Sequence, residues 1–138
     1  MFLLATLAFA SPAYDQLKLR DPVPCSGLGE ATPALRDELL ALASPAILPS
    51  VVPMRAADCL AHLFAADLNV QAAFLTWMTD PGRAGQALLI LGRADTLPEP
   101  VLVGLLAGAR QSSSVRVKER AEAMVAARAA VPVPAPAP

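Results

Sequence analysis

Charged, aromatic and metal-binding side chains are scarce in this chain of 138 residues. Charged residues make up 17% of it and aromatic residues 4%, against a charged fraction of ~25% in a usual globular domain. The 11 Lys and Arg are interleaved with 12 Asp and Glu, giving a net charge of -1. There is no basic stripe, so we expect no nucleic-acid partner. No apolar run approaches the ~18 residues that a membrane-spanning helix needs, so we expect no integral membrane span in the mature chain.

The single histidine, His62, limits the metal and nucleophile chemistry open to the chain. On a helix it would share one side with Asp58 and Cys59, a cluster that could bind a metal or activate a thiol. Metal sites usually take three or four ligands, and the chain has no second histidine and no closely spaced cysteine pair. We therefore expect no metal, no cofactor and no enzymatic activity. Three further acids at predicted turns are explained most simply as helix caps: Asp80, Asp95 and Glu99.

The first ten residues, MFLLATLAFA, are interpreted as a signal peptide. Ala8-Phe9-Ala10 before Ser11 has the small-x-small form of a cleavage site. The usual positively charged leader region is missing, which leaves open whether the true start lies upstream of Met1. With a signal peptide the protein is exported, periplasmic or secreted; otherwise it is cytoplasmic.

The two cysteines are Cys25 and Cys59. In an exported chain one disulfide between them is an option, and it would attach the N-terminal segment to a helix. The alternative for Cys59 is a small core residue. Sequence does not give the distance between the two sulfur atoms, so both interpretations stay open.

Ala, Leu and Val are abundant, and hydrophobic residues reach 55% of the chain. Their spacing predicts helices, because apolar residues recur every three or four positions. The predicted helices cover about residues 33–43, 51 or 53 to 66, 70–79, 81–93, 101–109 and 115–130. Thr32 is the predicted cap of the first helix and Asn69 that of the third. The sequence therefore predicts an all-α domain over residues 32–130.

Prolines separate this domain from both ends of the chain. Residues 11–31 contain three prolines and two glycines and are expected to form an irregular leader, with a turn of helix or a short extended piece over residues 15–20. Residues 131–138 read VPVPAPAP and predict an extended, polyproline-like tail.

The last predicted helix carries a branched apolar residue and a base, then an alanine, then an apolar pair: Val117, Lys118, Ala121, Met124 and Val125. This pattern resembles that of the second helix of a HEAT repeat, and the Asp80-Pro81 turn resembles the turn within such a repeat. The resemblance covers about residues 32–130, with turns at intervals of about thirty residues. It implies a short α-solenoid of about three helical hairpins that binds proteins along a groove. The alternative fold is a closed helical bundle.

The sequence thus favours a non-catalytic protein-protein interaction or scaffold module with an unknown protein partner. The candidate residues for an interaction face are Arg55, Arg83, Arg116 and Trp77, although Trp77 fits a helical core better than a surface. The alternative function is a small exported helical protein that binds an apolar ligand. A closed apolar cavity would favour that alternative, and an open groove would favour the interaction module.

Overall fold

The regular structure is entirely helical in the part of the chain that the computed structural model describes, residues 11–130. No strand occurs among these residues. The α-helices are α2 (Pro12–Leu17), α3 (Pro33–Leu42), α4 (Val51–Leu63), α5 (Leu68–Thr79), α6 (Ala84–Leu91), α7 (Glu99–Ala109) and α8 (Val115–Ala129). Three short 3-10 turns lie between them: η1 (Cys25–Leu28), η2 (Pro81–Arg83) and η3 (Ala94–Thr96). The all-α fold expected from the sequence is confirmed.

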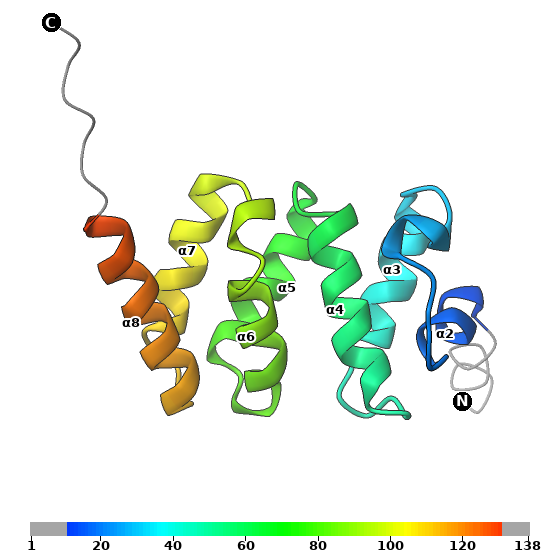
Figure 1. The fold of residues 1–138 in the computed structure, drawn as a ribbon, viewed down its shortest axis with the longest axis horizontal. Helices are drawn as coiled ribbons and strands as arrows, with labels where there is room; N and C mark the ends of the chain where they lie inside the picture. The colour runs from blue at the N-terminus through cyan, green and yellow to red at the C-terminus, as the bar shows by residue number, and fades with distance from the viewer. Residues whose placement is uncertain (1–10, 131–138) are drawn as a thin grey trace, which may run out of the picture.

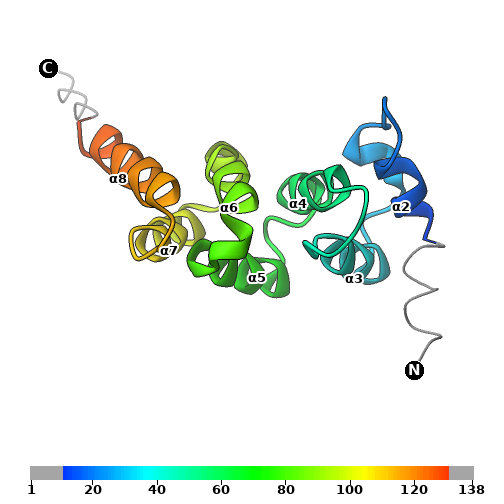
Figure 2. The same cartoon turned by 90° about the horizontal axis from the view of Figure 1, so that it is seen from below.

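The six longer helices lie in two layers, which Figure 2 shows end-on to the helices. One layer consists of α3, α5 and α7, and the other of α4, α6 and α8. Within the layers α4 packs on α6, α6 on α8, and α5 on α7; across them α3 packs on α4, α5 on α6, and α7 on α8. The result is a row of three helical pairs: α3 with α4, α5 with α6, and α7 with α8. The short helix α2 packs on α3 and α4 at the N-terminal end of the row (Figure 1).

The core lies between the two layers. Each of the six longer helices contributes at least one large side chain that is fully buried: Leu39, Leu60, Phe74, Ile90, Leu105 and Val117. Burying a side chain of this size stabilises the folded state by about 1.5–3 kcal/mol. This burial, distributed along the whole row, holds the helices together.

The start of α5 corrects one prediction. Asp67, not Asn69, caps the helix: its Oδ1 accepts hydrogen bonds from the backbone N–H groups of Asn69, at 2.9 Å, and Val70, at 3.1 Å. Asp67 is extended, with φ of -76° and ψ of 127°, so the helix begins directly after it at Leu68. Asn69 instead lies within the first turn. By contrast, the predicted cap Thr32 does accept the Leu35 N–H, at 3.2 Å.

Three other helices differ from the predicted ones at a boundary. The helix α7 begins at Glu99 after Pro98, so Glu99 lies in its first turn and is not its cap. The second helix of the first pair ends at Leu63 because Phe64, with φ of -131°, leaves the helical region. The helix expected over residues 81–93 consists of the 3-10 turn η2 followed by α6, because Arg83, with φ of -121°, interrupts the helical backbone.

The leader is more ordered than its prolines and glycines suggest. Ser11 Oγ accepts the Tyr14 N–H at 3.0 Å, and Pro12 occupies the first position of α2. Ala13 and Leu17 of this short helix are buried. The helix expected as one option over residues 15–20 therefore begins earlier, at Pro12, and ends at Leu17. Ser11-Pro12 repeats the start signal of Thr32-Pro33.

Two predicted segments lie outside the described residues: the signal peptide, residues 1–10, and the extended tail, residues 131–138. Between them, in residues 11–130, no helix combines the length and the apolar character that crossing a membrane requires.

The two glycines of α7 give a test of the α5–α7 contact. A Cβ on Gly104 would lie 3.6 Å from Leu75 Cδ2, and one on Gly108 would lie 3.5 Å from Met78 Cβ, both ordinary van der Waals distances. Gly104→Ala and Gly108→Ala should each raise the free energy of unfolding by about 0.5–1 kcal/mol, because alanine favours a helix interior. Urea denaturation measures the change.

The matched control is Gly29→Ala. Gly29 has φ of 116°, a conformation that costs alanine about 1 kcal/mol or more. This variant should therefore be destabilised. A destabilised Gly108→Ala protein would instead show that α5 and α7 lie closer together than described.

The cap of α5 also predicts that the stability of the fold depends on pH. Arg36 of α3 donates from Nη1 to Asp67 Oδ2 at 3.1 Å. Burial alone would raise the pKa of Asp67, but the hydrogen bonds from Arg36 and the Val70 N–H lower the pKa below its ordinary value. A lowered carboxyl pKa stabilises the fold above the unfolded-state pKa of about 4, and this contribution is lost as pH falls through the lower, folded-state pKa.

Asp67→Asn should therefore destabilise the protein at pH 7, and the difference from the parent should shrink below about pH 4. Asparagine keeps the capping oxygen, so the variant measures the contribution of the carboxylate charge alone. Thermal unfolding across this pH range measures the effect. A stability difference between the variant and the parent that stays constant down to pH 2 would contradict the lowered pKa of Asp67.

Candidate functional site

Two of the four residues predicted for an interaction face contact each other inside the molecule. Trp77 is 5% exposed, and the Arg83 guanidinium carbon lies 4.8 Å from the centre of its ring. Arg83 Nη1 also donates to the Ala43 carbonyl at 2.8 Å. Arg83 therefore joins the second helical pair to the first, and Trp77 is a core residue.

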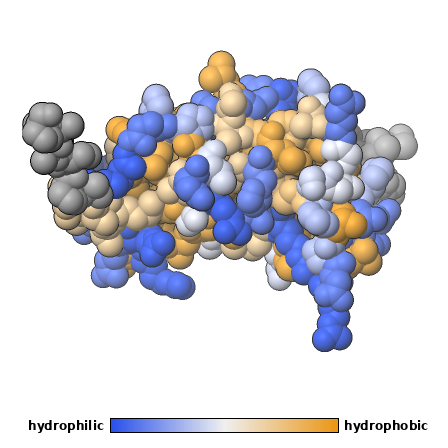
Figure 3. Space-filling model, turned by 45° about the horizontal axis from the view of Figure 1, so that its top comes forward, coloured by the Kyte–Doolittle hydropathy of each residue, from blue (hydrophilic) through white to orange (hydrophobic). Residues whose placement is uncertain are grey.

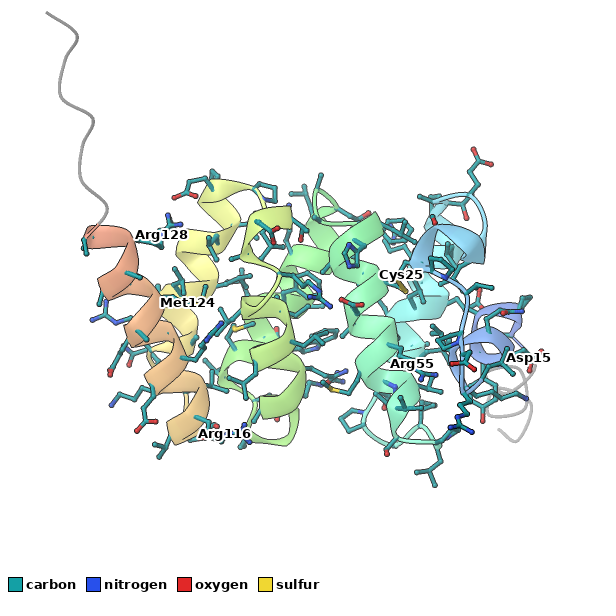
Figure 4. All side chains as sticks on the ribbon, viewed as in Figure 1. Asp15, Cys25, Arg55, Arg116, Met124 and Arg128 are labelled. Carbon is teal, nitrogen blue, oxygen red and sulfur yellow. A yellow bond between two sulfur atoms is a disulfide. The ribbon has the colours of Figure 1, made fainter. Side chains whose placement is uncertain are left out.

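The other two predicted residues lie on the side of the row formed by α4, α6 and α8. Arg55 of α4 is half-buried, and its Nη1 donates to the carbonyl of Leu17 at 2.7 Å and also to that of Leu19. Arg116 is exposed near the start of α8, at the other end of that helix from Arg128 (Figure 4). Figure 3 shows this side, where hydrophilic residues are scattered between hydrophobic ones.

Gln86, a residue that the sequence analysis did not single out, completes the junction around Arg83. It is 4% exposed. Its Nε2 donates to the carbonyls of Ala43, at 2.8 Å, and Pro53, at 3.0 Å, and its Oε1 accepts from Arg83 at 3.1 Å. The signal in the sequence was a lone amide within the apolar helix AGQALLIL.

The cluster of Asp58, Cys59 and His62 does share one helical side. Asp58 Oδ1 accepts from Arg93 Nε at 2.6 Å and lies 3.5 Å from His62 Nε2. The hydrogen bond to Asp58 raises the pKa of Arg93 above its ordinary value. Cys59 forms a disulfide with Cys25, so its thiol is not available as a nucleophile. No group of three or more potential metal ligands occurs in residues 11–130.

A hollow of about 440 Å³ lies beside this disulfide, and we name it the disulfide pocket. Both cysteines line it. The other apolar lining residues come from α2, the segment before η1, and α4: Leu17, Pro22, Val23, Pro24 and Leu63. The polar lining residues are Ser26, Arg55, Asp58 and His62. Several of them, including Val23, Ser26 and His62, are exposed, so the pocket opens to solvent and is not a closed cavity.

A second feature is the outer side of α5 and α7. The helix α5 has no charged residue, and α7 has only Glu99. Five outward residues at helical spacing are apolar, and we name them the α5–α7 face: Leu68, Ala72, Leu75, Val103 and Ala107. The uncharged polar residues Asn69, Thr76 and Thr79 are exposed beside them on α5. Leu68 is 78% exposed, Leu75 44% and Val103 54%.

The α5–α7 face continues into a shallow trough between α7 and α8. This trough has a volume of about 280 Å³, and its apolar lining includes Val103 and Val125. Arg110 and Arg128 line it as well. Arg128 forms an ion pair with Glu99 at the start of α7, and Arg110 is exposed.

Comparisons with known protein families, with curated proteins and with solved structures found no match. Function is therefore inferred from the residues and contacts described above.

The disulfide gives the most direct test of the site. The Cys25–Cys59 bond closes a separation of 34 residues, and restricting the unfolded chain over such a loop stabilises a protein by about 2–4 kcal/mol. Reduction, or replacement of both cysteines by serine, should lower the free energy of unfolding by that amount. Guanidinium denaturation with and without reductant measures it.

The doubly substituted protein is the control, because its stability should not respond to reductant. Mass analysis after alkylation should find neither cysteine labelled before reduction and both labelled afterwards. Labelling of both cysteines in the untreated protein would contradict the disulfide.

Proposed function

We propose that this chain is a non-catalytic protein-binding module of the HEAT-repeat type, and that its partner binds on the α5–α7 face. The observation that carries the proposal is the exposure of Leu68, Leu75 and Val103 on two neighbouring helices that carry no charge there. Contiguous exposed apolar surface on a protein commonly marks an interaction site.

The composition of the face supports a partner rather than a solvated surface. The outward side of a surface helix usually carries charged residues, as α8 does with Arg116, Lys118 and Glu119. On α5 the corresponding positions include Leu68 and Leu75. A partner that covered these side chains would remove apolar area from water, which favours association.

The neighbouring trough indicates the chemistry of that partner. Val103 belongs to both the α5–α7 face and the trough, so the two are continuous. Arg110 and Arg128 give the trough a positive border that Glu99 balances only in part. We expect the partner to place an apolar side chain in the trough and a carboxylate beside Arg110.

The arrangement of the helices supports the HEAT-like interpretation. Paired helices pack in two layers, as in α-solenoids. In α8, Val117 and Ala121 are buried and Met124 and Val125 are half-buried, as the resemblance to a second repeat helix requires. Lys118 is exposed.

The disulfide supports an oxidising location for the module. Disulfides persist in exported proteins and are rare in the cytosol. The Cys25–Cys59 bond therefore agrees with the proposal that the protein is exported, in the periplasm or outside the cell.

Charged substitutions on the face test the proposed function. The full oxidised chain is the bait in affinity capture from an extract of the source organism. Leu75→Glu and Val103→Glu should each reduce the captured partner to about a tenth or less, because a carboxylate in the centre of an interface costs at least a tenfold loss of affinity.

Val115→Glu is the matched control. Val115 is 65% exposed on α8, so it undergoes the same chemical change away from the face and should keep capture intact. Circular dichroism checks that all three variants fold. A partner that binds all three variants equally, or that is lost equally from all three, would contradict the proposal.

A further inference from the structure

We propose that the disulfide pocket binds a small carboxylic acid with an aliphatic or aromatic body. This site is separate from the α5–α7 face and does not depend on the proposed protein partner. Its volume of about 440 Å³ falls in the range of about 300–1,000 Å³ that is usual for small-molecule sites.

The lining divides into an apolar wall and a polar edge. Leu17, Val23, Leu63 and the disulfide supply apolar contacts, whereas Arg55 and His62 supply donors. Ligand sites are commonly built in this way, with mostly apolar walls and a few polar groups that fix orientation. A molecule with one apolar part and one polar part fits the lining.

Arg55 indicates that the polar part of the ligand carries a negative charge. It is half-buried, and within residues 11–130 no carboxylate forms an ion pair with it. The only acid in the lining, Asp58, is held by Arg93 at 2.6 Å. Arg55 therefore has no paired carboxylate at the pocket, although two backbone carbonyls accept its hydrogen bonds. A half-buried charge gains from an opposite charge placed beside it.

The hydrogen bonds of Arg55 leave capacity for a ligand. A guanidinium has five N–H donors, and Nη1 donates to the carbonyls of Leu17 and Leu19. Nε and Nη2 remain, and a carboxylate accepts hydrogen bonds from such a pair of nitrogens. These carbonyl bonds also fix the side chain in place before a ligand arrives.

Other ligand classes fit less well. A cation would meet Arg55 without a free acid, since Asp58 is already paired with Arg93. A phosphate group carries more charge than the single arginine of the lining matches. A neutral apolar molecule would leave the guanidinium unpaired. A monoanion with an apolar body fits both the apolar wall and the polar edge of the pocket.

Three eight-carbon probes separate these classes: octanoate, octan-1-ol and octylamine. The full oxidised chain is titrated with each and followed by calorimetry and by chemical shifts of the Cys25, Arg55 and His62 amides. Octanoate should bind saturably at one site, and octanol and octylamine should bind at least about tenfold more weakly, because they lack a charge-assisted bond to Arg55.

Arg55→Gln should weaken octanoate by at least about tenfold and leave octanol unchanged. Arg116→Gln is the matched control, since it removes an exposed arginine from α8, and it should bind octanoate like the parent. Arg55 also holds the end of α2, so thermal unfolding of both variants is measured alongside binding.

A second variant keeps the test decisive if Arg55→Gln does not fold. Ser26 is exposed and lines the pocket, so Ser26→Trp fills the space without removing a core contact. It should abolish binding of octanoate. The proposal is overturned if octanoate does not saturate by about 1 mM, if octanol or octylamine binds as tightly, or if Ser26→Trp binds octanoate like the parent.

Discussion

The constraint on which the structure depends is the lack of charge in its central helices. α5, α6 and α7 together carry one charged residue, Glu99, so none of them can cover its apolar surface alone. α6 shows the consequence most clearly. It has eight residues and contacts α4, α5, α7 and α8. An isolated helix of this length is not stable in water, so its neighbours hold it in place and the pairs stabilise one another.

The two junctions of the row are built differently. Polar side chains connect the first pair to the second, through Arg36 with Asp67, Asp58 with Arg93, and Gln86 with two backbone carbonyls. No side-chain hydrogen bond joins the second pair to the third in residues 11–130, where α7 packs on α5 through apolar contacts. Directional bonds specify the geometry of the first junction. The disulfide pocket lies on the other side of the first pair, between α4 and the N-terminal segment. The apolar α5–α7 face lies across the second junction.

Local sequence signals predicted most of the helices. The features that depend on contacts between distant residues could not be predicted in this way. Thr32-Pro33 identified the start of α3, yet the same signal at Ser11-Pro12 was missed because the surrounding prolines and glycines suggested a loop. Asp67 and Asn69 are both good caps, and no periodicity separated them because Leu68 is exposed. The role of Gln86 could not be predicted, since its partners lie 43 and 33 residues away. The pairing of Cys25 with Cys59 and the existence of the disulfide pocket depend on the same kind of distant contact.

The central claim is that the helical pairs form an open row whose two ends do not meet (Figures 1 and 2). Small-angle X-ray scattering from the oxidised protein tests this claim most directly. A compact domain of 138 residues has a radius of gyration of about 14 Å. The row predicts a clearly larger value and an asymmetric distance distribution with a long tail. A value near that of a compact domain, with a symmetric distribution, would show a closed bundle and contradict the account.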